Sequence, residues 1–483
     1  MGTRYLVLTD GTTTLDLAAG ASCYLQSYVP RSPDLTTQDL DPGALHDGGE
    51  RASTTRRNVT ESARVLVSAQ AGGAPDPAVA RAAIRSIEAL LRQAEEWQRR
   101  RVGAAVYVVY GPQGAEASDL YRSEVLSGRV ELSDSALKAG YLDEGLVEIL
   151  VVWTRRFYWE ANSETELSLT NGGGSGTGGQ TVYNHDDAGA GHDNYVAIAA
   201  GDVAGVLPTP ARLAVTNSLN DANSKTRTLW VGHNAFSEPA SFAHILEGED
   251  DTEGAVQVDA SCSGGNFQRV VMGASEVLLF SWALSTTQLT YCASNWFRVL
   301  CRFANLPAAN AHVRLKLDRA GAGSTIIWSG PLVNLSDELS IQELGTLQLP
   351  PFLTGGTAAA CYLQIFGYAD SGTPNIDIDF LQLTPLDSYR QFTSSVLYVV
   401  YNDRLVDDDP AGYLYVDTPA TPANGRQGGT VSIGSQILLW PSRAQRLYFL
   451  QRAWTSGAPT DELAAIDRTL TVRVYYRPRR LTI

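Results

Sequence analysis

The chain of 483 residues lacks the sequence signatures of the common catalytic, nucleotide and metal sites. Its five cysteines are widely spaced, without a CxxC pair or a Cys/His cluster, so neither a disulfide framework nor a zinc site is indicated. No Walker lysine, GxSxG or HExxH motif is present. No apolar run is long enough to cross a bilayer, and residues 1–7 read as a strand rather than a signal peptide. We therefore expect no catalytic residues, no cofactor, no bound metal and no membrane insertion.

Lysine is nearly absent. Of the 37 lysines and arginines only three are lysine, at Lys138, Lys225 and Lys316. Genomic base composition explains this bias, and so does the use of arginine at protein–protein interfaces. The sequence does not separate the two explanations. The net charge of −15 argues against a nucleic-acid partner, since binding to phosphates needs a basic surface.

One amphipathic helix is predicted over residues 78–101. Its apolar positions recur at alternating intervals of four and three residues, which keeps them on one face; they are Ala80, Ile84, Ile87, Leu91 and Ala94. A Pro-Asp-Pro segment at 75–77 suits the start of a helix, and the three arginines at 99–101 suit its end. Strand-like segments precede and follow it, at 63–67 and 106–110.

Three domains are predicted, and the expected fold class is mainly β. Residues 1–163 form a β-rich α+β domain that contains the helix 78–101. Within it, the polar stretch 30–58 is long for a loop and is interpreted as mobile or as an arm ordered by a neighbouring molecule. Residues 164–388 hold many short segments of alternating polarity, which predict an inserted β-sandwich or jelly roll.

The third predicted unit, residues 389–483, contains an echo of the first. The tetrapeptide Tyr-Val-Val-Tyr occurs at 107–110 and again at 398–401. If the echo is structural, the two ends of the chain form one β-domain and the middle is an insert, an arrangement that exposed loops commonly accept. Residues 389–483 are therefore expected to complete or pair with the N-terminal domain.

Two glycine-rich segments are candidate ligand-binding sites. Residues 174–179 match GxGxxG, but a strand follows at 181–183 where a nucleotide site requires a helix. Residues 185–187 and 192–194 read His-Asp-Asp and His-Asp-Asn in one loop, so calcium or magnesium could bind their oxygens. The competing interpretation is a polar turn stabilised by side-chain-to-backbone hydrogen bonds.

Two further groups of residues suggest carbohydrate chemistry. Asp377 and Asp379 alternate on one strand and so share a face, as a pair of glycosidase carboxylates would. An ordinary exposed strand reads the same way. The β-rich middle also holds four tryptophans, which stack on sugars if exposed and fill the core if buried; they are Trp230, Trp282, Trp296 and Trp328.

Several segments together resemble minor tail proteins of tailed bacteriophages, of the distal-tail or tail-tip class. The likeness covers the first and last units better than the middle, and no single motif in it is specific. The segments that carry it are 58–61 (NVTE) with the helix after it, 121–129 (YRSEVLSGR), 167–172 (LSLTNG), 205–210 (GVLPTP) and 474–479 (VYYRPR). The middle resembles a jelly-roll module of the carbohydrate-binding type, although no sugar-binding aromatic pair or calcium pattern can be matched in it.

The resemblance implies a virion structural protein of the tail, made in the host cytoplasm. It implies a homo-oligomer, as a ring, hexamer or trimer, in contact with other tail proteins, with the β-domain building the ring and the insert facing outward. Two alternatives remain. The middle domain could bind a glycan of the host surface, or the chain could be a capsid decoration protein. An enzyme acting on polysaccharide is a further hypothesis, centred on Asp377 and Asp379.

Overall fold

The fold is mainly antiparallel β-sheet with one α-helix in the described part of the chain, which confirms the predicted fold class. The computed structural model describes residues 5–483 except 21, 41–49, 69, 72–73, 113–114, 117–118, 133–145, 186–190, 219–224, 236–243, 252, 286–287, 290–294, 322, 324, 350–360, 395–398, 400–401, 409–412, 418–429 and 454–468. No helix among these residues has both the length and the apolar character needed to span a bilayer.

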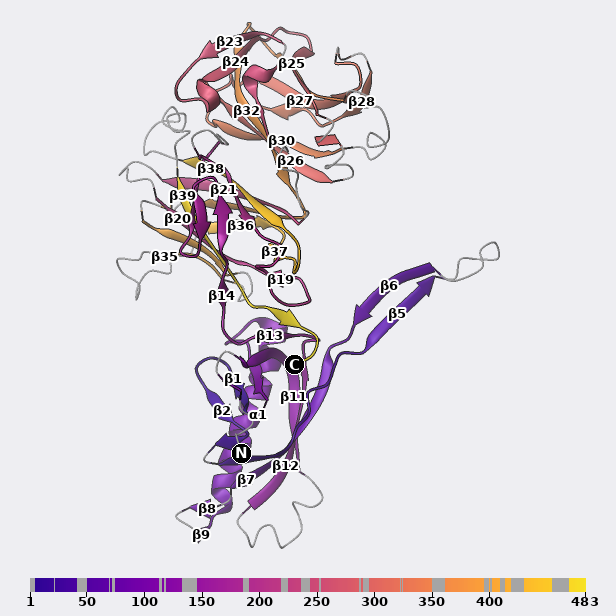
Figure 1. Ribbon diagram of the computed structural model, residues 1–483, viewed down its shortest axis with the longest axis vertical. Helices are drawn as coiled ribbons and strands as arrows, with labels where there is room; N and C mark the ends of the chain where they lie inside the picture. The colour runs from indigo at the N-terminus through magenta and orange to yellow at the C-terminus, as the bar shows by residue number, and fades with distance from the viewer. Residues whose placement is uncertain are drawn as a thin grey trace. The chain divides into compact units, whose positions relative to one another are not determined.

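The chain forms two compact units (Figure 1). Unit 1 consists of Met1–Thr165, Ala204–Leu207 and Arg477–Ile483, and unit 2 consists of Glu166–Val203 and Pro208–Tyr476. The chain therefore passes between the units four times. The last seven residues return to the unit that the first 165 residues build, so unit 2 is an insert held at both ends.

Unit 1 is built on an antiparallel sheet that bends along one long strand. The order is β2 (Thr14–Asp16), β1 (Tyr5–Thr9), β10 (Tyr107–Gly111), β11 (Tyr121–Leu132), β12 (Leu146–Arg155), β7 (Val59–Ser68), β4 (Cys23–Ser27) and β3 (Ala19–Gly20), with β13 (Trp159–Ala161) beside β11 and β40 (Arg479–Arg480) beside β13. The first half of β11 pairs with β10 and the second half with β12, with a bulge between Val125 and Ser127. A bulge bends the strand, so β11 serves both halves of the sheet.

The helix α1 (Pro77–Arg100) begins and ends within one residue of the prediction, so the predicted helix is confirmed. The Asp76 carboxylate caps it by accepting from the backbone N–H of Ala78 at 2.9 Å, and Arg101 ends it in the left-handed conformation. Its apolar face is buried in the core of unit 1. A Cβ at Gly128 of β11 would lie 2.7 Å from the Leu91 side chain, so this glycine lets the helix approach the sheet closely.

A two-stranded ribbon leaves this domain (Figure 1). It consists of β5 (Leu35–Leu40) and β6 (Glu50–Arg56), which in the described part of the chain pair only with each other. Its base is closed, because the backbone N–H of Arg57 donates to the carbonyl of Asp34 at 3.4 Å. The polar stretch expected at 30–58 thus forms an arm. A second short pair is β8 (Gln70–Ala71) with β9 (Ala74–Pro75).

Unit 2 contains two β-sandwiches, and the first uses both ends of the unit's sequence. One sheet has the order β14 (Thr165–Glu166), β39 (Leu470–Tyr476), β20 (Arg212–Asn217), β34 (Arg404–Asp408), β35 (Tyr413–Asp417), with β17 (Gln180–Val182) beside β39. The other has β16 (Gly174–Gly176), β15 (Leu169–Asn171), β18 (Tyr195–Ile198), β38 (Gln445–Ala453), β21 (Thr226–Asn234), β33 (Ser388–Ser394) and β36 (Thr430–Gly434). Both sheets contribute to one apolar core, and β19 (Thr209–Pro210) pairs with β37 (Leu438–Leu439).

The second sandwich lies between β21 and β33 in the sequence. One sheet has the order β23 (Ala255–Val258), β24 (Asn266–Val271), β32 (Asn375–Pro385), β26 (Trp296–Phe303), β30 (Ile341–Gln348), with β22 (Ile245–Glu247) beside β32. The other has β25 (Val277–Ala283), β31 (Tyr362–Ala369), β27 (Ala311–Asp318) and β28 (Ile326–Ser329), with β29 (Val333–Asn334) beside β27. The short 3-10 helices η3 (Gly248–Asp250) and η4 (Ser263–Gly265) flank β23. A small apolar cluster that includes Trp230, Phe380 and Tyr389 joins the two sandwiches.

The structure pairs the C-terminal segment differently from the expectation. Within 389–483 only Arg477–Ile483 belongs to unit 1, whereas β38 and β39 pair with β21 and β20 of the first sandwich. The tyrosine echo at 398–401 lies outside the described residues except for Val399, which is buried in the core of the first sandwich. Local residue patterns indicate a strand, but the partner strand is chosen by packing between residues far apart in the sequence.

Candidate functional site

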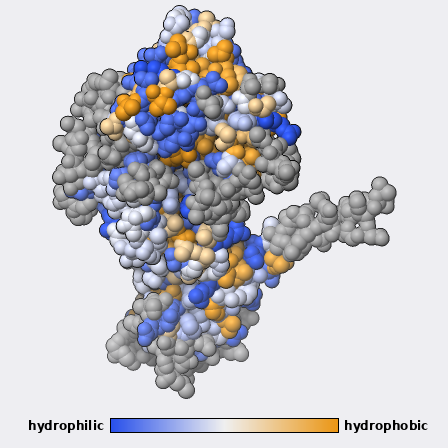
Figure 2. Space-filling model, turned by 45° about the horizontal axis from the view of Figure 1, so that its top comes forward, coloured by the Kyte–Doolittle hydropathy of each residue, from blue (hydrophilic) through white to orange (hydrophobic). Residues whose placement is uncertain are grey.

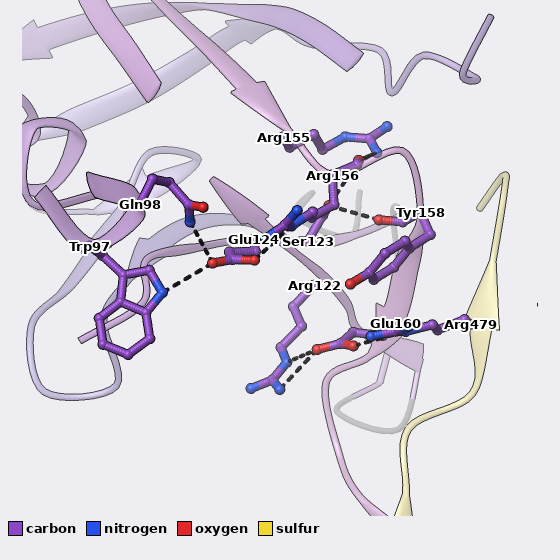
Figure 3. Close-up of polar contacts among 10 residues, drawn as sticks. All are labelled: Trp97, Gln98, Arg122, Ser123, Glu124, Arg155, Arg156, Tyr158, Glu160 and Arg479. Carbon is purple, nitrogen blue, oxygen red and sulfur yellow. Dashed lines mark hydrogen bonds and ion pairs between the residues drawn. The ribbon is translucent and has the colours of Figure 1, made fainter. Parts of the chain in front are cut away.

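A network of charged and aromatic side chains lies in unit 1 where the chain departs for unit 2 and where its last residues return (Figure 3). Its members come from β7, from β11, from the end of β12 and the turn after it, from β13, from β40 and from the last turns of α1. Three carboxylates organise it, on Glu61, Glu124 and Glu160.

The Glu61 carboxylate forms a fully buried ion pair with Arg155, with Nη2 and Oε1 2.7 Å apart and both side chains 0% exposed. It also accepts hydrogen bonds from the Tyr28 hydroxyl and from the backbone N–H of Arg31, each at 2.7 Å. The Arg155 guanidinium donates to the carbonyls of Arg31 and Arg156 and lies 4.1 Å from the centre of the Trp159 ring. Burial, together with the negative charge of Glu61, raises the pKa of Tyr28. This pair joins β7, β12 and the segment that leads to the arm.

The Glu124 carboxylate of β11 holds the end of the helix. It accepts from the Trp97 indole at 3.2 Å and the Gln98 amide at 2.6 Å, and it pairs with Arg156 at 2.8 Å (Figure 3). On the adjacent residue, the Ser123 hydroxyl donates to the carbonyl of Tyr158 at 2.7 Å. Side chains of β11 therefore fix both α1 and the turn between β12 and β13.

The Glu160 carboxylate of β13 ties the C-terminal strand to the sheet. It pairs with Arg122 of β11 at 2.9 Å and with Arg479 of β40 at 3.6 Å. The two guanidiniums also lie over aromatic rings, Arg122 over Tyr107 at 4.2 Å and Arg479 over Tyr158 at 4.0 Å. Burial raises the pKa of Tyr107 to about 12.

A third segment joins this connection. The backbone N–H of Val206 donates to the carbonyl of Arg479 at 2.8 Å, beside the pairing of β40 with β13. Gly205 allows the approach, because a Cβ there would lie 2.7 Å from the Arg479 carbonyl oxygen and its φ is +108°. The Arg477 guanidinium completes the connection by donating to the carbonyls of Ala161 and Asn162.

This arrangement can fasten chain segments together, and it shows no nucleophile aligned with a general base. Its carboxylates are all engaged by arginines, and its arginines by carboxylates, carbonyls or rings. We interpret it as the structural lock that holds the inserted unit. No sequence motif predicted it, because its members are spread from Glu61 to Arg479.

The loop with the two histidine–aspartate segments is held by hydrogen bonds to the protein. The Asp193 carboxylate accepts from the backbone N–H of Gly172, and the Asn184 side chain bonds both ways with the backbone of Gln451. Asp186 and Asp187 lie outside the described residues. Within the described ranges, no group of three or more His, Cys, Asp or Glu residues is placed to hold a metal ion. These contacts agree with the polar-turn interpretation.

The two aspartates considered for catalysis are buried in ion pairs. Asp377 receives two hydrogen bonds of 2.7 Å from Arg269 and a third from Asn305, and it is 3% exposed. Asp379 pairs with Arg302 and accepts from the backbone N–H of Ser263. Because arginines and backbone groups occupy the carboxylate oxygens, neither residue is arranged as a general acid or nucleophile.

The structure also shows where the glycine segment 174–179 and the four middle-region tryptophans lie. Gly174–Gly176 forms β16, and the strand β17 follows, as predicted. Trp230 and Trp282 are buried and Trp328 packs against the core of the second sandwich, whereas Trp296 at the start of β26 is 53% exposed. Trp296 is thus the most exposed of the four candidates.

His233 on β21, which no sequence motif marks, is fully buried. Its ring nitrogens lie 3.1 Å from the Ser388 hydroxyl and 3.1 Å from the Gln445 side-chain oxygen. Burial lowers its pKa to about 4, against the opposing effect of the hydrogen bond that its ring makes to the Gln445 side-chain oxygen. A neutral histidine inside the first sandwich makes the stability of unit 2 sensitive to acid.

Comparison with known proteins establishes no family. No family model matches the chain, and no curated protein matches it. Among solved structures, the chain is similar to the Dit protein of phage SPP1, described as a hub adsorption apparatus, with a TM-score of 0.31, 8% identity and 98% of each chain covered. It is also similar to a chain of the phage P2 baseplate, with a TM-score of 0.27, 9% identity, and 77% of this chain and 100% of that chain covered.

Weaker likeness extends to a chain of infectious bursal disease virus, Gt strain. The TM-score is 0.18 at 10% identity, with 57% of this chain and 66% of that chain covered. Scores this low do not establish a shared fold, so the function proposed below rests on the features of the chain itself.

We predict that breaking the buried pair destabilises unit 1 strongly. Arg155→Met or Glu61→Gln should lower the free energy of unfolding of unit 1 by about 3–5 kcal/mol, because each leaves one buried partner uncompensated. The measurement is chemical denaturation of the full chain, followed by the fluorescence of the tryptophans in unit 1.

The matched control is Arg92→Met. Arg92 pairs with Glu96 on the exposed face of α1, at 3.5 Å with side chains 80% and 52% exposed, so its loss should cost below about 1 kcal/mol. Equal losses in the buried-pair and control variants would contradict the role given to Arg155 and Glu61.

A second prediction concerns acid. In the unfolded chain His233 is protonated below its ordinary pKa of about 6.5. In the folded chain it stays neutral down to about pH 4. Stability of unit 2 should therefore fall as the pH falls from 6.5 to 4, by about 3 kcal/mol from this residue alone. In His233→Gln, unfolding free energies measured across this range should lose that part of the pH dependence.

His312 provides a control of opposite sign. Hydrogen bonds to Asp370 and Asn334 raise its pKa, so its contribution is present below pH 6.5 and lost as the pH rises through the higher folded value. His312→Gln should leave the acid-induced loss in place. A His233→Gln protein that keeps the full acid slope would disprove the assignment.

Proposed function

We propose that the chain is a non-enzymatic structural protein of a bacteriophage tail, a homo-oligomeric tail-tip component. In this proposal unit 1 builds a ring, as a hexamer or trimer, and unit 2 is the module that the ring carries outward. The assignment to a phage tail rests on the sequence resemblance of the first and last segments. The assignment to assembly rests on the arm β5–β6.

The arm supports assembly because it has no partner within the described chain. An isolated two-stranded hairpin is only marginally stable in water, and three strands or a packing surface are needed to stabilise it. The described strands of unit 1 supply neither, since β5 and β6 pair with each other alone. A neighbouring subunit would provide the missing contacts, and main-chain pairing along an exposed strand is an established way to do so.

The locked connection in unit 1 supports the division of roles. Glu160 and its arginines fasten the last segment of the chain to the sheet of unit 1, so the two ends of the insert are anchored in one folded unit. The pairing of Arg155 with Glu61 lies beside the same connection and near the base of the arm. The contacts that hold the insert and the base of the arm proposed for assembly thus lie in one region of unit 1.

Removal of the arm should abolish self-assembly and leave unit 1 folded. Residues 35–56 are replaced by a short glycine–serine turn, which fits because Asp34 and Arg57 are already hydrogen-bonded. We expect the intact chain to form rings or trimers by light scattering and negative-stain imaging, and the armless chain to be monomeric with unchanged helix content.

The matched control changes another exposed strand. Val431→Ser with Ile433→Ser alters β36 of unit 2, where these side chains are 61% and 58% exposed, and should leave assembly unchanged. A strictly monomeric intact chain at high concentration, or an armless chain that still assembles, would refute the proposal. Gold label on the capsid of intact virions would favour a decoration protein instead.

A second candidate function, binding of a host-surface glycan, is favoured by the exposure of Trp296. An indole has apolar ring faces that can stack on a sugar and an N–H that can donate to it, and Trp296 is the most exposed of the four middle-region tryptophans. Arg298 and Glu343, which pair at 2.8 Å on the neighbouring strands β26 and β30, would supply hydrogen bonds.

Trp296→Ala should then weaken binding of the full chain to host cells and to a glycan array by roughly tenfold, equivalent to about 1.4 kcal/mol. Tyr24→Ala, which removes a 47% exposed ring from unit 1, is the control and should bind as the unmodified chain does. Absence of any glycan binding by the unmodified chain would eliminate this candidate.

A further inference from the structure

The second sandwich of unit 2 has an uncovered core at one edge. Among the residues that the structure describes, β23 is the last strand of its sheet and pairs with β24 alone. The register places Val256 opposite Gln268 and Val258 opposite Asn266, and cross-strand partners share a face. Val270, two residues beyond Gln268, packs against the main core of this sandwich. Val256 and Val258 therefore lie on the core-facing side of the sheet.

These core-facing side chains are nevertheless in water. Val256 is 51% exposed and Val258 is 87% exposed. The opposite sheet also ends in an edge strand, β25, whose first residue Val277 is 45% exposed. The register places Val277 opposite Gly367, where a Cβ would point at the buried Leu279 and Val313, so Val277 lies on the core-facing side. Figure 2 shows apolar residues at the top of the view, where unit 2 carries these strands.

The two edges belong to the same side of the sandwich. The Asp251 carboxylate, four residues before β23, accepts from the backbone N–H of Ser281 in β25 at 2.5 Å. The Trp282 indole donates to the carbonyl of Glu247 at 2.7 Å. We call Val256, Val258 and Val277 the valine edge. A single extended strand laid beside β23 would cover its core-facing valines.

The negative charge near the valine edge favours a binding partner with basic residues. Residues 245–268 contain six carboxylates and no lysine or arginine, and Asp250 and Glu253 just before β23 are exposed. The cation that lies opposite β23, Arg269 across from Ala255, is paired with the Asp377 carboxylate. Pairing of β23 with β23 of a second copy would bring two such acidic segments together, and like charges placed opposite each other are destabilising. A segment with basic residues at its ends would be attracted instead.

We propose that the valine edge binds an extended segment of another protein, which adds as a strand beside β23. The segment has β-branched apolar residues at alternate positions, which cover the valines, and lysine or arginine at its ends, which meet Asp250 and Glu253. β23 carries none of the usual protections of an edge strand, since it has no charge, no proline and no bulge. This inference does not depend on the tail assignment.

The test uses synthetic peptides and the full chain. The probe is a fluorescent peptide of alternating valine and threonine with two lysines at each end. The comparison peptides carry glutamates at the ends or a proline in the middle. We expect the lysine-flanked peptide to bind at least about tenfold more tightly than either of the others, because charge and main-chain pairing both favour it. Hydrogen exchange should slow at the amides of β23.

Two variants separate the contributions. Val256→Ser with Val258→Ser should weaken peptide binding at least about tenfold by removing the apolar contact. Asp250→Asn with Glu253→Gln should reduce the preference for lysine over glutamate ends. The control is the β36 variant, Val431→Ser with Ile433→Ser, which alters an equally exposed edge and should bind the peptide normally. All these side chains are exposed, so the melting temperatures should be unchanged.

Three results would overturn the proposal. The first is no binding of the lysine-flanked peptide at millimolar concentration. The second is equal binding of the glutamate-flanked or proline-containing peptide, or equal loss in the β36 control. The third is concentration-dependent dimerisation of the full chain that the Val256→Ser, Val258→Ser variant abolishes, because a second copy would then be the occupant.

Discussion

The pairing of β13 with β40, held by the Glu160 carboxylate between Arg122 and Arg479, is the constraint on which the rest of the architecture depends. It returns the end of the chain to unit 1 and so makes unit 2 a closed insertion. Insertions of whole domains are tolerated where the entering and leaving segments are adjacent at a surface. Here a third segment, Ala204–Leu207, reinforces the connection, and Gly205 is the residue that lets it approach.

Nested insertion explains the order of the sandwiches in the sequence. The first sandwich is built from strands on both sides of the second, since β21 pairs with β38 across more than two hundred residues. Such pairings close very long loops, yet the entropy of loop closure grows only slowly with length. A sandwich can therefore be interrupted at one edge loop without losing its core.

Much of the local structure was predictable from the sequence, and most of the pairing was not. The helix was predicted to within a residue because its periodicity, its Asp76 cap and its terminal arginines all agree. Strands of alternating polarity such as β27 were equally clear. Among the C-terminal strands, β40 joins unit 1 as expected, whereas β38 and β39 pair within unit 2. A repeated tetrapeptide is a local feature and carries no information about packing. This misled the expectation for Val399, which lies in the core of unit 2.

The network of charged side chains in unit 1 could not be predicted either, because its partners are far apart in the sequence. Glu61 and Arg155 are 94 residues apart, and Asp377 and Arg269 are 108 apart. Alternation correctly places Asp377 and Asp379 on one face of a strand, but a sequence pattern does not show that arginines from β24 and β26 meet them there. A catalytic pair was only an alternative interpretation beside the expectation of no catalytic residues, and the sequence could not decide between them, because an exposed acidic face and a row of ion pairs have the same local sequence.

The arginine bias of the chain acquires a structural reading from these contacts. In the lock of unit 1, Arg122, Arg155 and Arg479 each meet a carboxylate or carbonyl and also lie over an aromatic ring. A planar guanidinium can do both at once, whereas the compact ammonium of lysine cannot make a forked hydrogen bond in the same plane. Arginine is therefore used inside the unit and not only at surfaces. An abundance of arginine in such a chain does not by itself indicate an interface. The surfaces proposed to bind partners are the arm and the valine edge.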